Sequence, residues 1–483
     1  MAVRFGTDGW RAVIADEFTM SNVALVAAAA AALLHERGTA GEGVVVGHDR
    51  RFLSDAFARR CAHVLASSGV RVLLCGYPCP TPAVGLAVRS TSSALGIIVT
   101  ASHNPYQYNG IKLRAATGAP LGPEDRRWIE EWIASARDGI MSRLARPGGE
   151  GRIRAHDPWP EYRNHVAARV DLEAIGAAGR TVIHDAMHGA AAGWLERLVP
   201  QVRTVRRSRD PLFGGTVPEP LAENLTSLSR RVRRSARPAI GLATDGDGDR
   251  LAAIAEDGTY VDSHHLLALL YSHLVEVRGL RGRAVRTVTT SALVDRLAES
   301  YGLPVDVTPV GFWHVARRFA AAVRPPAVIG GEESGGIGFP LHLPERDGIF
   351  AGLMLLEHLT RQGVTLREAI DRLAQRCGRT YIDRRDVRLP AGEAAAEEAE
   401  RACLPPRTLL GRPVLRWQRV DGLCIEAAGA CRLHVRASHT EPVLRLYAEA
   451  GSREDVAALL EEGIALVRAG DRGLRDGVPP VAV

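Results

Sequence analysis

Short apolar runs alternate with segments of helical spacing along the first 140 residues of the chain. The runs at 43–47, 70–75 and 95–100 are rich in β-branched residues, as buried strands are. Between them, 22–36 and 54–67 place apolar residues at the spacing of an amphipathic helix. Such alternation is typical of βαβ units on a mostly parallel sheet.

The same alternation returns twice further along, and the end of the chain differs. After about residue 398, four strand-like runs precede one final helix, which is an α+β order. We therefore expect three α/β domains and a C-terminal α+β domain. The later predicted elements are strands at Thr181–Asp185, Ala239–Thr244, Leu251–Glu256, Ala284–Thr289 and Ala327–Gly330, and helices at His264–Val277, Phe350–Arg361 and Arg453–Arg468.

Two stretches interrupt the pattern and set the expected domain boundaries. Ala145–Pro158 is rich in Gly, Pro and Arg and reads as a linker. Asp383–Glu398 contains Pro390, Gly392 and an acidic, Ala-rich helix. The expected domains are 1–145, 155–257, 258–375 and 380–483.

Composition places the chain among ordinary globular proteins. Of 483 residues, 46% are hydrophobic and 24% charged. No window approaches 18 apolar residues, and the start MAVRFGTDGW lacks a basic beginning and an apolar core, so we expect neither a membrane span nor a signal peptide. The seven cysteines are scattered, odd in number and form no CxxC, which predicts a reduced, cytoplasmic setting.

A net charge of +6 and a pI near 9.1 would suit a nucleic-acid partner. However, only 5% of residues are aromatic, which leaves few stacking platforms for bases. The basic run Arg230–Arg237 has helical spacing and reads as a solvated helix face. We therefore expect no nucleic-acid partner, and a phosphorylated small molecule would need only a few of these cations.

Lysine is nearly absent from the chain. Of 61 Lys and Arg residues, only Lys112 is lysine. Its ammonium is compact and can lose a proton where its pKa is lowered, whereas a guanidinium is larger and stays charged. We expect Lys112 to act as an accessible cation at a reacting group, so that replacing it with arginine would leave the fold unaffected.

The segment Thr100–Lys112, TASHNPYQYNGIK, directly follows a predicted buried strand. Ser102 therefore lies where the chain leaves a sheet, which is where α/β proteins bind ligands. It is flanked by His103 and Asn104, and Pro105 stiffens the turn. From these residues alone, Ser102 is either a phosphoryl carrier or the hydroxyl of an ordinary ST-turn.

The segment Asp245–Arg250, DGDGDR, alternates three carboxylates with glycines after another predicted strand. Carboxylate oxygens suit a hard cation such as Mg²⁺, and the glycines allow the backbone to fold around it. A calcium loop of the EF-hand type is an alternative, but it requires glycine where Arg250 stands. A solvated acidic turn is the other alternative, and the pattern favours the metal.

Two further segments offer groups that bind sugars and phosphates. Gly330–Gly336, GGEESGG, carries Glu332 and Ser334 on a backbone that allows close approach, and it is followed by His342–Gly348, HLPERDG. In Arg436–Arg445, RASHTEPVLR, the arginines and hydroxyls are those of an anion cradle, although a β-hairpin with incidental arginines would look the same. The cradle residues are Arg436, Ser438, Thr440 and Arg445.

In their order along the chain, these four segments resemble the α-D-phosphohexomutase family of phosphoglucomutases and phosphomannomutases. The opening Phe5–Arg11, FGTDGWR, matches that family's first motif, and the resemblance covers nearly the whole chain. It implies an α/β fold of four domains, three α/β/α domains with mixed sheets and a C-terminal α+β domain, which contribute their loops to one cleft. Shorter matches are Gly47–Arg51 (GHDRR), Glu223–Leu225 (ENL) and Thr308–Phe312 (TPVGF), which contains Gly311.

The resemblance implies that Ser102 is phosphorylated and exchanges its phosphoryl group with a hexose phosphate through a bisphosphorylated sugar. Three groups of residues would surround that reaction. Mg²⁺ would be held by Asp245, Asp247, Asp249 and a phosphoserine oxygen; Arg11, Lys112, His103 and Arg250 would lie beside the phosphoserine; and Gly311, Glu332, Ser334 and the cradle Arg436, Ser438, Thr440 and Arg445 would bind the sugar and its other phosphate.

The sequence departs from the family pattern at three positions. Gly336 ends the sugar loop where some members carry histidine, and His342 is the expected catalytic substitute. His439 stands where the phosphate loop usually has glycine. Trp313 replaces a lysine that contacts substrate in the family, which would narrow or slow the enzyme.

The expected activity is interconversion of hexose 1-phosphate and hexose 6-phosphate, with glucose as the first expectation and glucose 1,6-bisphosphate as activator. Phosphomannomutase and phosphoglucosamine mutase are the alternatives, and a catalytically weak sugar-phosphate-binding homologue is a third. An intact Ser102 and three aspartates favour an enzyme over a pure binder. The expected partners are small hexose phosphates, with no membrane and with a monomer or homodimer as the assembly.

Overall fold

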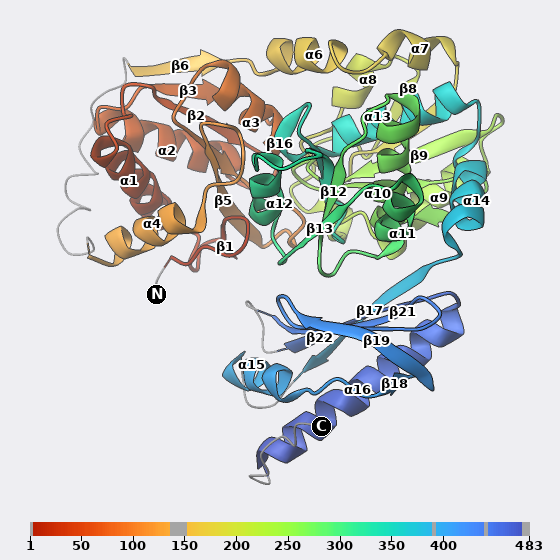
Figure 1. The fold of residues 1–483 in the computed structure, drawn as a ribbon. Coiled ribbons are helices and arrows are strands. Elements are labelled where there is room, and N and C mark those ends of the chain that lie inside the picture. Colours follow the sequence, from red (N-terminus) through yellow and green to blue (C-terminus); the bar gives the residue numbers. More distant parts are fainter. Residues whose placement is uncertain (1–2, 136–151, 389–392, 439–442, 476–483) are drawn as a thin grey trace. The chain divides into compact units, whose positions relative to one another are not determined.

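The computed structural model describes residues 3–135, 152–388, 393–438 and 443–475. The chain divides into two compact units (Figure 1), which are described one at a time. The first comprises Met1–Val285 and Gly311–Ala369, and the second comprises Arg286–Val310 and Ile370–Val483.

The first sheet is mixed, with strand order β1-β5-β4-β2-β3-β6. Its centre is parallel: β2 pairs with β3 and β4, and both β2 and β4 are buried at every residue. The strand β5 returns antiparallel to β4 and pairs with β1. The strands are β1 (Trp10–Val13), β2 (Val44–His48), β3 (Val72–Cys75), β4 (Leu95–Val99), β5 (Tyr108–Ala115) and β6 (Ile153–His156).

Four helices cover this sheet (Figure 1): α1 (Met20–Glu36), α2 (Ser54–Ser67), α3 (Thr81–Ser90) and α4 (Pro123–Ser135). Helix α1 begins after Thr19, whose hydroxyl accepts the N–H of Asn22 at 3.2 Å as an N-cap. It packs on α2 and α4, and its run of buried alanines allows a close approach. On the sheet, α3 packs against β2 and β4.

The second sheet has the order β11-β10-β9-β7-β8, parallel on one side of β9 and antiparallel on the other. Helix α9 buries Leu228 and Val232, while the arginines around them are exposed, as the sequence predicts. The elements are α6 (Trp159–Ala167), α7 (Leu172–Ala177), β7 (Thr181–Asp185), α8 (Trp194–Leu198), β8 (Val202–Val205), the 3₁₀ turns Phe213–Gly215 and Ala222–Leu225, α9 (Thr226–Arg233), β9 (Ala239–Thr244), β10 (Leu251–Ile254) and β11 (Tyr260–Val261).

The third sheet has the order β13-β12-β14-β15-β16. The side chain of Asp347 caps α13 by accepting the N–H groups of Ile349 and Phe350, both at 2.9 Å. The elements are α10 (Ser263–Ser272), the π turn His273–Val277, β12 (Arg283–Thr287), α11 (Leu293–Tyr301), β13 (Val305–Thr308), α12 (Phe312–Phe319), β14 (Ala327–Gly331), β15 (Ile337–Phe339), β16 (Leu343–Arg346), α13 (Gly348–Gln362) and α14 (Leu366–Cys377).

The fourth sheet, in the second unit, is antiparallel with the order β17-β22-β21-β20-β19-β18. Residues of α15 and α16 pack on one of its faces and form the core there. The elements are β17 (Tyr381–Arg388), α15 (Glu393–Ala402), β18 (Thr408–Leu409), β19 (Arg412–Arg419), β20 (Leu423–Ala427), β21 (Cys431–Ala437), β22 (Val443–Ala450) and α16 (Arg453–Arg475).

Two predicted interruptions contain strands. The described end of the expected linker Ala145–Pro158 forms β6, which pairs with β3, so the first sheet extends past the boundary expected near residue 145. The stretch expected to break the pattern from Asp383 instead forms most of β17, paired with β22 along its whole length. Most residues of β17 are charged, and β6 has only four residues, which include Arg154 and His156, so neither carries the apolar run by which buried strands are recognised.

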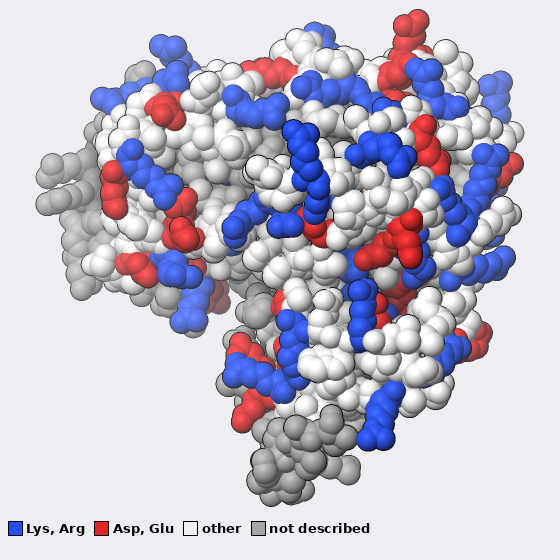
Figure 2. Space-filling view, viewed as in Figure 1, with Lys and Arg blue, Asp and Glu red and all other residues white. Residues whose placement is uncertain are grey.

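One face of the molecule carries charges of both signs (Figure 2). Figure 2 shows Lys and Arg side chains spread over the visible face and interspersed with Asp and Glu. No helix among the described residues is both long enough and apolar enough to cross a lipid bilayer.

Candidate active site

Ser102 lies two residues after Thr100, where the chain leaves β4, and it is 1% exposed. Its backbone has a φ of 52°, in the left-handed region that costs energy for a residue other than glycine. The hydroxyl donates to Asp245 Oδ2 at 2.8 Å and lies 3.4 Å from His103 Nδ1. The nucleophile expected from the sequence therefore contacts the first aspartate of the expected metal loop.

Two motifs that look independent in the sequence are parts of one structure around this serine. Arg51, in GHDRR, is fully buried and its Nη2 donates to the carbonyls of Ser102 and Asn104, while Nη1 donates to those of Pro105 and Tyr108. A strained φ of the kind found at Ser102 costs of order 1–3 kcal/mol and persists only where the surroundings fix it. Loss of Arg51 would leave four carbonyls without these donors, so the position of Ser102 depends on the arginine as much as on its own loop.

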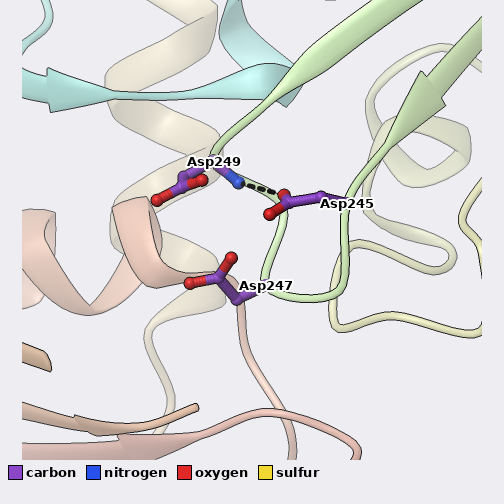
Figure 3. A group of neighbouring side chains, drawn as sticks. All are labelled: Asp245, Asp247 and Asp249. Atoms are coloured by element: carbon purple, nitrogen blue, oxygen red, sulfur yellow. Dashed lines mark hydrogen bonds between the residues drawn. The ribbon is translucent and has the colours of Figure 1, made fainter. Parts of the chain in front are cut away.

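The metal loop joins β9 to β10 and brings Asp245, Asp247 and Asp249 together (Figure 3). All three side chains are fully buried, and one carboxylate oxygen from each lies within 4.8 Å of the other two. The backbone N–H of Asp249 donates to Asp245 Oδ1 at 3.0 Å, which fixes the curvature of the loop. A side chain at Gly246 would have its Cβ 2.4 Å from the Ser102 carbonyl oxygen, so only glycine permits this approach.

The carboxylates have the arrangement that a divalent cation requires. Asp247 Oδ1 and Asp249 Oδ1 are buried and accept no hydrogen bond, which is costly unless something else satisfies them. Burial and the charges of Asp247 and Asp249 raise the pKa of Asp245 well above its ordinary value. Oxygen donors of this kind suit Mg²⁺, so the residues fit that ion.

Lys112 is buried against the same carboxylates rather than exposed. It extends from β5 and is 1% exposed, and its Nζ lies 2.6 Å from Asp249 Oδ2, 2.8 Å from Asp247 Oδ2 and 3.0 Å from Asp8 Oδ2. Burial alone would lower its pKa, but the three carboxylates raise the pKa above the ordinary value. The expectation of an accessible lysine that can lose its proton is therefore wrong, because these partners hold it charged.

Two residues that the sequence analysis did not select complete this charge cluster. Asp8, in the opening motif, pairs with Lys112, with Arg346 and, at 3.0 Å, with Arg114. Arg346 also contacts Asp249 Oδ2 at 2.9 Å and Glu332 Oε2 at 3.1 Å. Asp8 lies in FGTDGWR and Arg346 in HLPERDG, between Glu345 and Asp347, so the only available signal was a charged side chain inside each motif.

The other cations expected beside Ser102 are also close to it. Arg11 Nη1 donates to Asn104 Oδ1 at 2.6 Å, and Arg250 Nη1 donates to Glu219 Oε1 at 2.8 Å. Burial, followed by the charges of Arg250 and Arg11, holds the pKa of His103 well below its ordinary value. The imidazole beside Ser102 is therefore neutral.

The sugar loop runs alongside the metal loop, since the Leu251 N–H donates to the Gly335 carbonyl at 3.0 Å. Glu332 follows β14 and its Oε1 accepts the N–H of Gly311 at 3.2 Å. Burial raises the pKa of Glu332 to about 7, although Arg346 opposes the shift. Ser334 is half-buried on the same loop.

His342 lies in the packed interior and not in this cluster. Its Nε2 is 2.8 Å from Asp347 Oδ2, and its ring stacks on Phe350 with centroids 4.1 Å apart. The ring is fully buried among these partners, and Tyr162 also donates to Asp347. The structure therefore supports a packing role for His342 at the start of α13 in place of the expected catalytic one.

Trp313 is half-buried on the first turn of α12. Its Nε1 lies 3.4 Å from the point where a Cβ on Gly122 would be, and the Arg317 guanidinium lies 4.9 Å from its ring centroid. The indole thus packs against the segment before α4 and beneath a neighbouring cation.

The expected phosphate loop belongs to the second unit, at the β21–β22 hairpin. Arg436 and Arg445 are direct partners in the register of these strands. Like charges directly opposite each other are destabilising. Arg445 Nε lies 3.8 Å from Asp386 Oδ2. Arg436 is also 3.1 Å from Asp421 Oδ1, and the buried Ser438 donates its N–H to Val443 at 3.0 Å. Thr440 and His439 lie outside the described residues.

Four family models match the chain in succession. They describe the alpha/beta/alpha domains I, II and III of phosphoglucomutase/phosphomannomutase, at residues 2–139, 160–258 and 262–377, and the C-terminal domain, at 387–466.

Relatives are similar over nearly their whole length. A Thermococcus kodakarensis phosphoglucomutase/phosphomannomutase is 32% identical, covering 98% of this chain and all of that protein. A Moorella thermoacetica phosphoglucosamine mutase is 31% identical, covering 95% and 98%. Among solved structures, a Thermus thermophilus protein provisionally assigned as a phosphomannomutase is 36% identical, with a TM-score of 0.84 and coverage of 97% and 100%. Matched in all four domains and along its relatives' full length, the chain belongs to the phosphoglucomutase/phosphomannomutase family, the α-D-phosphohexomutases.

Proposed function

We propose that this phosphohexomutase moves a phosphoryl group between the 1- and 6-positions of a hexose phosphate, with Ser102 as carrier. The observation that carries the proposal is the contact of a buried serine hydroxyl with Asp245, 2.8 Å away, at the edge of a three-carboxylate cluster. A structural serine turn has no need of such a cluster. The proposed partners are small hexose phosphates.

The chemistry balances over two half-reactions. In the first, a sugar hydroxyl oxygen bonds to the phosphorus of phosphoserine, the Ser102 Oγ–P bond breaks, and the hydroxyl proton passes to Oγ. This leaves a hexose bisphosphate. In the second, Oγ attacks the other phosphorus, the sugar O–P bond breaks, and the proton returns to the sugar oxygen. Asp245 accepts the hydroxyl of free Ser102, which orients Oγ for the second attack.

Asp245, Asp247 and Asp249, together with a phosphoserine oxygen, would hold Mg²⁺. When bound, this ion neutralises charge on a transferring phosphoryl group. The two unpartnered oxygens, Asp247 Oδ1 and Asp249 Oδ1, support this assignment.

The surrounding cations would keep the phosphoryl group in place. Lys112 is fixed by three carboxylates, and Arg11 and Arg250 are each oriented by one oxygen contact. The neutral His103 would contribute a ring nitrogen beside Oγ. No catalytic role is proposed for His342.

Recognition of the sugar is proposed for Gly311, Glu332 and Ser334. Glu332 is held by Gly311 and Arg346, so its carboxylate has a fixed direction. The facing pair Arg436 and Arg445 supports binding of the phosphate that is not reacting. We assign the other cradle residues, Ser438 and Thr440, to the same phosphate.

We propose mannose or glucosamine phosphates as preferred substrates, ahead of the glucose phosphates first expected from the sequence. The support is that relatives of nearly equal similarity carry the names phosphoglucosamine mutase and phosphoglucomutase/phosphomannomutase. The matching hexose 1,6-bisphosphate would then replace glucose 1,6-bisphosphate as activator.

We keep the four expected domains with one change, which moves the end of the first from 145 to His156, because β6 pairs in its sheet. The same boundary moves the start of the second domain from 155 to 157, and its end at 257 and the ranges 258–375 and 380–483 stand, with support from the matched family models. All seven cysteines are free thiols, which supports the proposed cytoplasmic setting. Monomer and homodimer both stay open as proposals.

Replacing Ser102 with Ala should lower the mutase rate by orders of magnitude, because the proposed mechanism has no other group that accepts the phosphoryl group. Intact-mass measurement should show a phosphate adduct on the wild-type protein that the variant lacks. Turnover near the wild-type rate in a folded Ser102→Ala protein would contradict the carrier role.

A coupled assay with mannose, glucosamine and glucose 1-phosphates, each with a trace of its bisphosphate, should rank the substrates. We expect kcat/KM for mannose or glucosamine phosphate to exceed that for glucose phosphate by about tenfold or more, because fixed carboxylates discriminate between sugar substituents. If glucose phosphate is used best, the proposed preference is wrong and the mutase assignment still holds.

Replacing Lys112 with Arg should lower kcat by about 10²-fold or more, because a guanidinium cannot place one charge at the point where three carboxylates meet. The larger group should also destabilise the fold by about 1–3 kcal/mol through overpacking. Steady-state kinetics and melting curves measure both effects. The exposed pair Arg59–Asp55 offers the control Arg59→Lys, which should change neither kcat nor the melting temperature. A Lys112→Arg protein with wild-type kcat and stability would contradict this role of the lysine.

Sugar recognition by Glu332 should depend on pH through a pKa near 7. The ionised carboxylate accepts sugar hydroxyls, so kcat/KM should rise as pH increases through about 7 and fall below it. In Glu332→Gln that step should disappear, while ionisation of the substrate phosphate near pH 6 is common to both proteins. Parallel pH profiles for the two proteins would exclude Glu332 as the titrating group.

A further inference from the structure

Thr81, at the start of α3, makes two hydrogen bonds to the second aspartate of the metal loop. Its Oγ1 donates to Asp247 Oδ2 at 2.6 Å, and its backbone N–H donates to the Asp247 carbonyl at 2.9 Å. Both residues are fully buried and lie 166 positions apart in the chain. The contact therefore joins the first sheet's helix layer to the loop after β9.

These bonds leave the two oxygens of the Asp247 carboxylate in different states. Oδ2 receives Thr81 Oγ1 and, at 2.8 Å, Lys112 Nζ. Oδ1 is buried and accepts no hydrogen bond. With two donors on one oxygen, the carboxylate cannot rotate without losing both, so Oδ1 is the atom that stays available to a cation.

The backbone of the loop is held at the same place. A Cβ on Gly248 would lie 3.2 Å from Pro80 Cβ, which places the preceding residue of the same segment against the loop. The Thr81 N–H bond to the Asp247 carbonyl then fixes the peptide that carries the carboxylate. Side chain and main chain of Asp247 are thus both held by Thr81.

We propose that Thr81 is a positioning residue for the metal, which orients Asp247 so that Oδ1 faces the bound ion. It does not contact substrate or metal itself. Partners of this kind, which hydrogen-bond to a ligating carboxylate, commonly change metal affinity by about 10–100-fold when removed. The inference rests on the proposed function, because it assumes that the three aspartates hold a divalent cation.

The test is direct titration of each purified protein with Mn²⁺, as a paramagnetic substitute for Mg²⁺, by electron paramagnetic resonance. Thr81→Val removes the donor and nearly keeps the shape, and we expect its Kd for Mn²⁺ to rise by about 10–100-fold. Thr81→Ser keeps the hydroxyl and should bind close to wild type. Thr81→Ala removes the donor and introduces no apolar group in its place, and it carries the test if Thr81→Val does not fold.

Ser272→Ala is the control, because Ser272 Oγ donates at 3.0 Å to the carboxylate of Glu276, between the end of α10 and the π turn that follows it and outside the metal loop. It should leave the Mn²⁺ Kd unchanged.

Activity gives a second measurement: a positioning role predicts that Thr81→Val needs more Mg²⁺ for half-maximal rate and recovers kcat at saturating Mg²⁺.

The outcomes separate this inference from the function beneath it. An unchanged Kd in folded Thr81→Val or Thr81→Ala overturns the role of Thr81 while the metal site stands. An equal loss in Ser272→Ala, or no rescue by Thr81→Ser, overturns it as well, since the effect would not be specific to the Thr81 hydroxyl. If the wild-type protein binds no Mn²⁺, both the inference and the metal part of the proposed function fail.

Discussion

The concentration of buried negative charge at the metal loop is the constraint on which the rest of this site depends. Asp245, Asp247 and Asp249 are all fully buried, and an isolated ionised carboxylate carries a large desolvation cost. Such a group persists only if cations and hydrogen-bond donors surround it. The first unit supplies them from separate segments: Lys112 from β5, Arg346 from the end of β16 and Thr81 from the start of α3.

This constraint gives a physical reason for one lysine in a chain with 60 arginines. Lys112 Nζ meets carboxylates of three different residues within 3.0 Å, a geometry that a compact ammonium with three donors can satisfy. A guanidinium spreads its donors over a plane and pairs best with one carboxylate from the side. Arg346 shows how a guanidinium contacts several carboxylates: its three nitrogens contact three different carboxylates, on different sides of the group.

The spacing of apolar residues predicted those elements whose structure depends mainly on their own residues. Three elements occur with the predicted bounds: the helix Ser54–Ser67 and the strands Thr181–Asp185 and Ala239–Thr244. Their apolar residues face the core, so the pattern within each segment was enough to identify it. The strand β17 escaped prediction because its partner β22 lies some sixty residues later and its own side chains are mostly charged and accessible. Asp8 and Arg346 meet across 338 positions, a contact that no spacing rule can express.

The candidate site shows the same division. The three aspartates could be named because their motif is a short segment with its own chemistry, whereas Ser102 was distinguished from an ordinary serine turn by the resemblance to the family. The misassigned His342 sits five residues before Asp347, and only the folded chain shows that this pair faces Phe350 and the start of α13. Whether a histidine is catalytic or packed depends on its neighbours in space, and one sequence does not contain them.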